Sequence, residues 1–229
     1  MDLTVVVPFY NEEKYIESSV TNLEKTKVAK FIFLVDDCST DKSSEIAENL
    51  SRRFEHVLLF KKDKNEGKGS CLNFVKNNIS TSHVIMHDAD LEQNPNDIHH
   101  MFKQAKTNPT SLILGSRTIG VQKRKKMYKL LSIANLVLCK IFNLLNSSKI
   151  SDISSGYLLY PTNFLNSISI QEFGFGIEVE ILSKFLKLKK NIIETPIDYL
   201  GRTYSSGKKI KLTDGVNIFI KIFKYRFYT

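Results

Sequence analysis

Short apolar runs alternate with longer amphipathic segments through the first half of the chain, and this alternation restricts the folds that it can adopt. The runs have the length of buried strands, whereas the segments between them place apolar residues at helical spacing. Strands separated by helices of this length form a mostly parallel sheet with helices on both faces. We therefore expect an α/β fold, and one domain over residues 1–229, because no repeat or low-complexity linker interrupts the sequence. The predicted strands are residues 3–7, 31–35, 57–60, 84–86 and 112–114.

The composition is that of a globular protein with an excess of positive charge. Of the 229 residues, 42% are apolar and 25% are charged, and the formal net charge is +9. We therefore expect an acidic partner, which would be nucleic acid, an anionic membrane surface or a phosphorylated small molecule. The basic residues do not alternate with aromatic residues as they do in common nucleic-acid-binding modules, so we expect no nucleic acid partner.

The cysteines predict a reducing compartment, and the apolar segments predict a chain that does not span a membrane. Cys38, Cys71 and Cys139 lie far apart and form no CxxC pair, which argues against a disulfide framework and against a structural zinc site. The first residues, MDLTVVVPFYNEE, lack the features of a secretory signal. No uncharged apolar segment reaches about 18 residues, so the sequence predicts no membrane-spanning helix.

Polar segments follow each of the five predicted strands. Ligands of such sheets bind at the carboxyl ends of the strands. We therefore expect these segments to converge at one edge of the sheet and to form a binding site there. They comprise residues 8–13, 36–37, 61–69, 88–92 and 115–117.

Three acids follow the fourth predicted strand, in the stretch HDADLEQNP. Asp88 and Asp90 offer oxygen ligands of the kind that suit magnesium or manganese, and magnesium commonly also takes phosphate oxygens of a substrate. Glu92 would supply a third oxygen, directly or through water. Solvated loop acids are the alternative explanation, and the position after a strand favours the metal.

Other polar groups at this edge have both a functional and a structural interpretation. Asp36 and Asp37 would accept hydrogen bonds from a nucleotide base or ribose, or they would precede the cap of the next helix. In KKDKNEGKGS, backbone N–H groups and Lys68 would hold a phosphate, or the segment is a flexible loop. Arg117 is a basic group of the site or a solvated residue of a turn.

Together these segments resemble the family-2 inverting glycosyltransferases, which have the Rossmann-like GT-A fold that binds nucleotide sugars. The D-x-x-S-G-Y segment and the late arginine before S-G-K-K are most similar to the dolichyl-phosphate mannose synthase group. Members of that group move a sugar from a nucleotide diphosphate to a polyprenyl phosphate. The matching segments keep the family's order: VVVPFYNEE (5–13), VDDCSTD (35–41), NEGKGS (65–70), DADLEQNP (88–95), GSR (115–117), DISSGY (152–157), FGIEVEIL (175–182) and ETPIDYLGRTYSSGKKI (194–210).

The resemblance implies roles for the matching positions. The residues that would bind the nucleotide sugar are Pro8, Tyr10, Glu12, Asp36, Asp37, Lys68, Asp88 and Ala89. The residues that would hold a magnesium or manganese ion on the diphosphate are Asp88, Asp90 and Glu92. The residues that would face the acceptor phosphate are Arg117, Ser132, Arg202 and Lys208. Two positions depart from the family, because glutamine is common where Glu92 stands and arginine is usual where Tyr128 stands.

The acceptor decides which residues catalysis requires. Departure of the nucleotide builds negative charge, which a metal held by Asp90 and a cation such as Arg117 would stabilise. A phosphate nucleophile is largely ionised at neutral pH and needs no base, whereas a sugar hydroxyl needs one. Asp152, Glu178 and Glu180 are the candidate bases, and all three have structural roles as the alternative.

We therefore expect transfer, with inversion, from a UDP- or GDP-linked sugar to a membrane polyprenyl or dolichyl phosphate. A hydroxyl group on a glycan is the alternative acceptor, and a nucleic-acid-binding module is the alternative from another class. The resemblance divides the chain into a nucleotide-binding half, a basic and apolar interfacial helical region, and an acceptor half with a C-terminal helix. These parts are residues 1–117, 118–150 and 151–229.

Two stretches that combine basic and apolar residues suggest contact with a membrane surface. They are KRKKMYKLLSIANLVLCKIFNLLN, residues 123–146, and VNIFIKIFKYRFY, residues 216–228. Interfacial helices have this pattern, and so do a core helix with solvated lysines and a homodimer seam. We expect a peripheral protein on the cytoplasmic face of the membrane, with a separate membrane-anchoring subunit or a second copy of the chain as a further partner.

Overall fold

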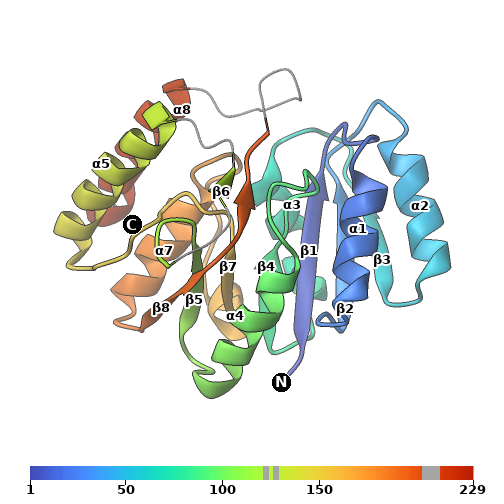
Figure 1. The fold of residues 1–229 in the computed structure, drawn as a ribbon, viewed down its shortest axis with the longest axis horizontal. Helices are drawn as coiled ribbons and strands as arrows, with labels where there is room; N and C mark the ends of the chain where they lie inside the picture. The colour runs from blue at the N-terminus through green and yellow to red at the C-terminus, as the bar shows by residue number, and fades with distance from the viewer. Residues whose placement is uncertain (121–123, 126–128, 203–211, 229) are drawn as a thin grey trace.

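The main feature of the fold is a seven-stranded sheet with the order β3-β2-β1-β4-β7-β5-β8 (Figure 1). The computed structural model describes residues 1–120, 124–125, 129–202 and 212–228. Neighbouring strands of the sheet are parallel, except that β7 is antiparallel to both β4 and β5. A separate parallel pair joins β6 to β9. The strands are β1 (Leu3–Phe9), β2 (Phe31–Asp36), β3 (Val57–Lys61), β4 (His83–Met86), β5 (Leu112–Ser116), β6 (Arg124–Lys125), β7 (Leu158–Pro161), β8 (Ile192–Pro196) and β9 (Tyr199–Leu200).

The predicted α/β fold is confirmed. Each of the five predicted strands is present and is longer than expected by only one or two residues. The strand β7 is not evident from the sequence pattern, because its run LLYP has four residues and ends in proline. It enters the sheet between β4 and β5, where all four of its residues are buried.

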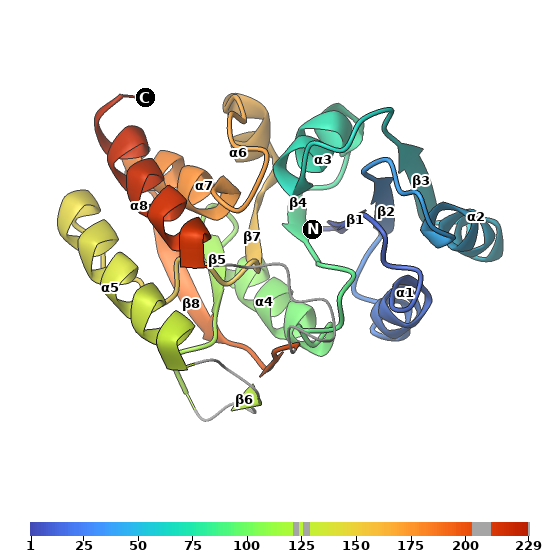
Figure 2. The same ribbon diagram turned by 90° about the horizontal axis from the view of Figure 1, so that it is seen from above.

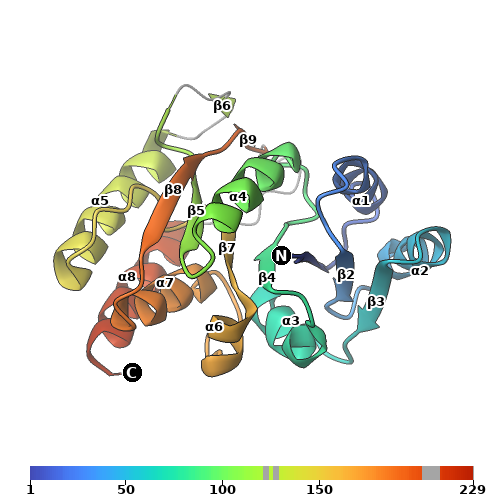
Figure 3. The same cartoon turned by 90° about the horizontal axis from the view of Figure 1, so that it is seen from below.

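Helices cover both faces of the sheet, as Figures 2 and 3 show. One apolar core lies between the sheet and α1, α2 and α4, and it includes Val20, Leu50 and Met101. The other core lies under α3, α5, α6, α7 and α8, and it includes Leu72 and Phe185. The helices are α1 (Ile16–Lys25), α2 (Ser43–Arg53), α3 (Lys68–Val75), the 3₁₀ turn η1 (Lys76–Asn78), α4 (Asn96–Thr107), α5 (Lys129–Asn146), α6 (Thr162–Ser167), α7 (Ile177–Lys187) and α8 (Leu212–Phe227).

The helices α5 and α8 lie side by side at one end of the molecule, and α8 also packs on α7 (Figure 2). The inward side of α8 is buried through Ile218, Ile222 and Tyr225. Both helices also carry exposed apolar side chains, which together are called the apolar face below. These residues are Ile133, Leu136, Val137 and Leu144 on α5 and Val216, Phe219, Ile220, Phe223 and Phe227 on α8.

Candidate active site

A cleft of about 480 Å³ lies at the carboxyl ends of the strands. All five polar segments that were expected to converge contribute to its lining, so the predicted convergence is confirmed. Residues at the start of α7 and on α5 and α8 complete the cleft. The predicted site residues that line it are Pro8, Tyr10, Glu12, Asp37, Lys68, Asp88, Ala89, Asp90, Glu92, Arg117, Ser132 and Asp152.

Four of the predicted site residues are not among those that line the cleft, and one of them, Arg202, contacts the lining residues Glu12 and Asp90. Asp36 is buried, and its carboxylate accepts a hydrogen bond from the Ser39 backbone N–H at 2.8 Å, as expected for a group that shapes a turn. Glu180 is buried in the first turn of α7 and accepts hydrogen bonds from the backbone and from Lys184. Lys208 lies outside the described residues.

The carboxylates of Asp88 and Asp90 stand together in the cleft, where they fit a divalent cation. Burial, and then the charges of Asp88 and Glu92, raise the pKa of Asp90 to about 7. A cation would neutralise this concentration of negative charge. The described residues contain no cluster of three or more ligating side chains. The two aspartates would supply oxygen ligands to such an ion, and phosphate oxygens and water commonly complete the shell of magnesium.

Arg202 connects the carboxylates on one side of the cleft. Its guanidinium lies 3.2 Å from Glu12 Oε2 and 3.2 Å from Asp90 Oδ2. The Arg202 backbone N–H donates to Glu92 Oε1 at 2.7 Å, and the Tyr199 hydroxyl donates to Glu92 Oε2 at 2.5 Å. Both oxygens of Glu92 thus accept hydrogen bonds from residues 199–202.

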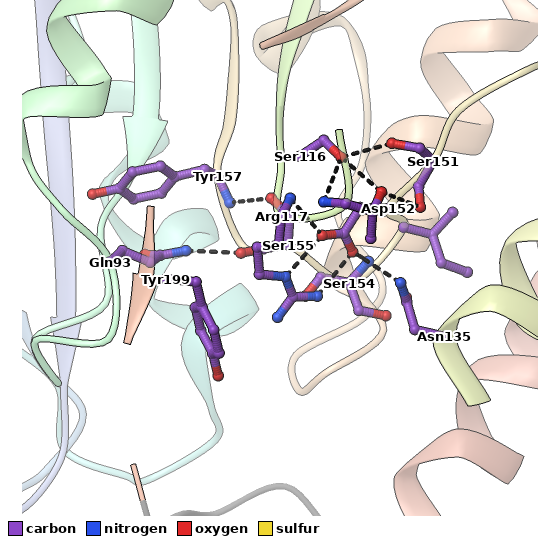
Figure 4. Close-up of polar contacts among 12 residues, drawn as sticks. Gln93, Ser116, Arg117, Asn135, Ser151, Asp152, Ser154, Ser155, Tyr157 and Tyr199 are labelled. Carbon is purple, nitrogen blue, oxygen red and sulfur yellow. Dashed lines mark hydrogen bonds and ion pairs between the residues drawn. The ribbon is translucent and has the colours of Figure 1, made fainter. Parts of the chain in front are cut away.

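Arg117 is held at the cleft by Asp152, as Figure 4 shows. Its Nε and Nη2 donate to the two carboxylate oxygens at 2.7 and 2.8 Å, and its backbone N–H donates to Oδ2 at 3.1 Å. Asn135 Nδ2 and the Ser154 backbone N–H add hydrogen bonds at 3.2 and 3.3 Å. Burial acts to raise the pKa of Asp152, but the charge of Arg117 and the hydrogen bonds from Arg117 and the Ser154 backbone outweigh it and keep the pKa below its ordinary value.

Lys68 lies at the first position of α3 and reaches two acids of the cleft. Its ammonium group forms an ion pair with Glu178 and lies 3.8 Å from Asp88 Oδ2. Burial acts to lower the pKa of Lys68, but the charges of Asp88 and Glu178 raise it above its ordinary value. The lysine therefore stays charged beside the carboxylates that would hold a cation.

The loop before Lys68 is shaped by Asp37. The Asp37 carboxylate accepts hydrogen bonds from the Gly67 backbone N–H at 2.6 Å and from Lys62 Nζ at 2.5 Å. Gly67 has a φ of 100°, a conformation that glycine adopts without strain. Asp37 lines the cleft and at the same time fixes the loop that carries Lys68.

Asn135 and Tyr199 are among the residues of the site that the sequence analysis missed. Asn135 lies on α5, three residues after Ser132, and both line the cleft. The helical spacing of i and i+3 was the available signal for Asn135. The ring of Tyr199 lies 5.1 Å from the Arg117 guanidinium carbon, and no local pattern marks that tyrosine.

Comparison with known protein families assigns the chain. The sequence pattern of the family described as "Glycosyl transferase family 2" matches residues 4–168. The chain belongs to glycosyl transferase family 2. The match begins within β1 and ends one residue after α6, so it includes the segments that carry Asp88, Arg117 and Asp152.

The names of two similar proteins include a lipid phosphate. The chain is 26% identical over 237 residues to a UDP-N-acetylglucosamine–dolichyl-phosphate N-acetylglucosaminyltransferase of Methanococcus voltae, covering 95% of this chain and 93% of the relative. It is 23% identical over 217 residues to an undecaprenyl-phosphate mannosyltransferase of Micrococcus luteus, covering 91% and 87%. An uncharacterised protein of Methanocaldococcus jannaschii is 29% identical over 234 residues, covering 96% and 90%.

Solved structures of the same fold include a complex with a metal ion. The glucosyl-3-phosphoglycerate synthase of Mycobacterium tuberculosis, bound to Mn²⁺, UDP and glucosyl-3-phosphoglycerate, superposes with a TM-score of 0.74. The sequences are 17% identical, and the match covers 98% of this chain and 79% of the synthase. The predicted GT-A fold is therefore confirmed.

Proposed function

We propose that this family-2 enzyme transfers a sugar from a nucleoside diphosphate to a polyprenyl phosphate at a membrane surface. The observation that carries the proposal is that all three candidate bases are engaged by protein partners. Asp152 pairs with Arg117, Glu178 with Lys68, and Glu180 with Lys184. A phosphate acceptor needs no base, so this arrangement favours it over a hydroxyl acceptor.

The donor would bind on the side of the cleft formed by β1, β2 and α3. Pro8, Tyr10 and Glu12 would contact the nucleotide, and Lys68 would contact its diphosphate. Asp88 and Asp90 would hold the divalent cation, magnesium or manganese. When bound there, the cation would act as a Lewis acid that neutralises charge on the leaving diphosphate.

The acceptor phosphate would lie near Arg117 and Ser132, with Arg202 completing its contacts. One of its oxygens would form a bond to the anomeric carbon while the bond from that carbon to the diphosphate oxygen breaks, which inverts the configuration. The ion pair with Asp152 would fix the guanidinium of Arg117 so that its remaining N–H groups face the phosphate. The hydrogen bonds to Glu92 support a role for that residue in positioning Arg202.

The lipid chain of the acceptor would follow the apolar end of the cleft. Leu138 on α5, Ile218 on α8 and Phe175 before α7 contribute to the lining at this end. An isoprenoid chain would gain free energy by burying its surface against such side chains. Both helices that carry the apolar face thus contribute residues to the lining, which supports delivery of the acceptor from a lipid surface.

The apolar face would rest on the membrane. Exposed Lys140 and Arg226 on the same two helices would interact with anionic headgroups, each contributing about 1 kcal/mol. No helix in the described part of the chain has the length and apolar character that a membrane crossing requires. The three cysteines are free, which suits a reducing compartment and supports placement on the cytoplasmic face.

The test is incubation with a panel of labelled UDP- and GDP-sugars and polyprenyl phosphates, with and without Mn²⁺ or Mg²⁺. We expect one donor to yield a lipid-linked sugar only when the cation is present. Transfer to a glycan hydroxyl, with no lipid-linked product from any donor, would contradict the proposal and support the alternative acceptor. Binding of random oligonucleotides without any response to UDP or GDP would reject both.

A further inference from the structure

A network of charged side chains joins α8 to the segment that precedes α7. The Glu172 carboxylate, which is only 7% exposed, forms an ion pair with Lys221 and accepts a hydrogen bond from Lys224 Nζ at 3.0 Å. The Tyr225 hydroxyl donates to the same carboxylate at 2.8 Å. Three side chains of one helix thus converge on a single buried acid that lies outside the lining of the cleft.

The backbone around Glu172 touches the loop that carries Lys68. The Gly69 backbone N–H donates to the Phe173 carbonyl oxygen at 2.8 Å. A Cβ atom at Gly69 would overlap the Glu172 carbonyl oxygen, and one at Gly67 would overlap that of Phe173. The two backbones therefore pack in direct contact on both sides of Lys68, so that a shift of either one moves the other.

A second connection runs through the start of α7. The side chain of Lys221 crosses Gly176 so closely that a Cβ atom there would overlap its Cδ atom. Gly176 is the residue before α7, and Glu178 in the first turn of that helix forms the ion pair with Lys68. Both connections start at Lys221 or its partner Glu172 and end at Lys68.

We propose that Glu172 is a positioning residue. It couples the packing of α8 against the segment before α7 to the binding of the nucleotide diphosphate by Lys68. The outward side of α8 carries part of the apolar face, so a helix that contacts lipid would be linked to the donor site. Coupling between two sites is reciprocal. Bound nucleotide stabilises the packed position of α8 to the same extent that packing of α8 strengthens nucleotide binding. This inference rests on the proposed function, because it takes Lys68 as a ligand of the diphosphate.

The first test measures the binding of UDP and of GDP, each with Mn²⁺, by isothermal titration calorimetry. Glu172→Gln keeps the size of the side chain and removes the charge that attracts the two lysines. We expect affinity for the nucleotide to fall about fivefold or more, which is the lower end of coupling between linked sites. Lys221→Met removes the partner on α8 and should cause a similar loss, although it lies outside the cleft lining.

The double variant separates coupling from independent effects. If both changes act through one ion pair, the combined loss of affinity will be clearly smaller than the product of the two single losses. Lys103→Met on α4 is the matched control, because it removes an exposed lysine from the opposite face of the sheet. The control should bind nucleotide like the wild type.

Hydrogen exchange of α8 supplies a measurement that a loss of stability alone would not reproduce. In the wild type, nucleotide with Mn²⁺ should slow amide exchange in residues 216–227, and Glu172→Gln should abolish that response while the helix remains folded by circular dichroism. Should Glu172→Gln fail to fold, the same measurement on Lys221→Met decides. Unchanged nucleotide affinity in the variants, or no response of α8 in the wild type, overturns the coupling, whereas failure of the wild type to bind either nucleotide overturns the proposed function.

Discussion

Arg117 and Asp152 form a buried, two-pronged ion pair in which the side chains are only 13% and 0% exposed. Nε and Nη2 of the arginine lie 2.7 and 2.8 Å from the two carboxylate oxygens, so both the charge and the orientation of the guanidinium are fixed. Arg117 directly follows β5, whereas Asp152 lies in the segment that precedes β7. The pair is therefore a property of the folded sheet.

Replacing Asp152 with asparagine should damage both stability and activity. The variant leaves the Arg117 guanidinium buried without its counter-charge, and breaking such a pair costs about 3–5 kcal/mol. Urea denaturation should show this loss, and the KM for the acceptor should rise because the arginine is no longer held. Near wild-type stability would mean that Arg117 finds another partner and that the pair does not position it.

Replacing Asp90 with asparagine should weaken the cation site. The change removes one negative charge from the two aspartates that would hold the ion. We expect Mn²⁺ affinity in the presence of nucleotide, measured by electron paramagnetic resonance, to fall at least about 100-fold, because even groups that only support a metal ligand contribute about 10–100-fold. Asp63→Asn, a change in an exposed loop, is the control and should leave Mn²⁺ binding unchanged. Equal Mn²⁺ affinity in the Asp90 variant would remove the basis of the cation site.

Glu92→Gln distinguishes a metal ligand from a residue that positions Arg202. Glutamine keeps an oxygen for the Arg202 backbone N–H but loses the charge that accepts from Tyr199. We expect the KM for the polyprenyl phosphate to rise severalfold, because hydrogen bonds to a charged acceptor are about twice as strong as neutral ones. Mn²⁺ affinity should stay within about twofold of the wild type. Removal of a metal ligand, or of a group that supports one, lowers metal affinity by more than that. A tenfold or larger loss of Mn²⁺ affinity would instead identify Glu92 as a ligand.

Most strands could be predicted from the sequence, whereas their order in the sheet could not. Five strands followed from their apolar runs. Four of them, β1, β2, β4 and β5, are buried along almost their whole length and read as continuous apolar stretches, whereas the edge strand β3 is only partly buried but still has an apolar run. The antiparallel strand β7 could not be placed, since its position between β4 and β5 depends on pairing with strands far away in the sequence.

The convergence of polar segments at the cleft was predictable, whereas the partners within it were not. Parallel strands bring their carboxyl ends to one edge, and this rule located Asp88, Lys68 and Arg117 together. The pairing of Glu178 with Lys68 depends instead on where the fold places the first turn of α7 relative to the start of α3, which no local pattern reveals. Glu180, two residues later on the helix, faces another side and accepts hydrogen bonds from the Gln171 and Glu172 backbone N–H groups, because residues i and i+2 of a helix do not share a face.

The stability of the protein should depend on the protonation of Asp97. The carboxylate accepts a hydrogen bond from the Asp198 backbone N–H at 2.8 Å, and burial is the main cause that raises its pKa from 3.8 to about 6. The folded state therefore binds this proton more tightly than the unfolded state, so the contribution of Asp97 to stability falls as the pH rises from about 4 to about 6 and stays low above that.

Asp97→Asn removes that dependence. At pH 7.5 the variant should have a free energy of unfolding about 3 kcal/mol higher than the wild type, following from about 1.4 kcal/mol for each pKa unit. At pH 4 the difference should vanish, because the wild-type carboxyl group is then protonated. Urea denaturation at several pH values measures both. A difference that is the same at every pH would show that Asp97 does not titrate in this range.

The apolar face should govern binding to lipid vesicles. Vesicles that contain anionic lipid should bring down the wild type on sedimentation at low salt, and binding should weaken as salt rises, because the basic residues of α5 and α8 are screened. The double variant Leu136→Ser and Ile220→Ser removes one exposed apolar side chain from each helix, which are 54% and 57% exposed. Each loss of buried apolar surface weakens binding by about 1–2 kcal/mol, so the combined affinity should fall at least about tenfold. Leu58→Ser, a change at an exposed apolar residue of β3, is the control and should sediment like the wild type. If the double variant and the control bind vesicles equally well, the membrane contact lies elsewhere and α5 and α8 need another partner to cover them.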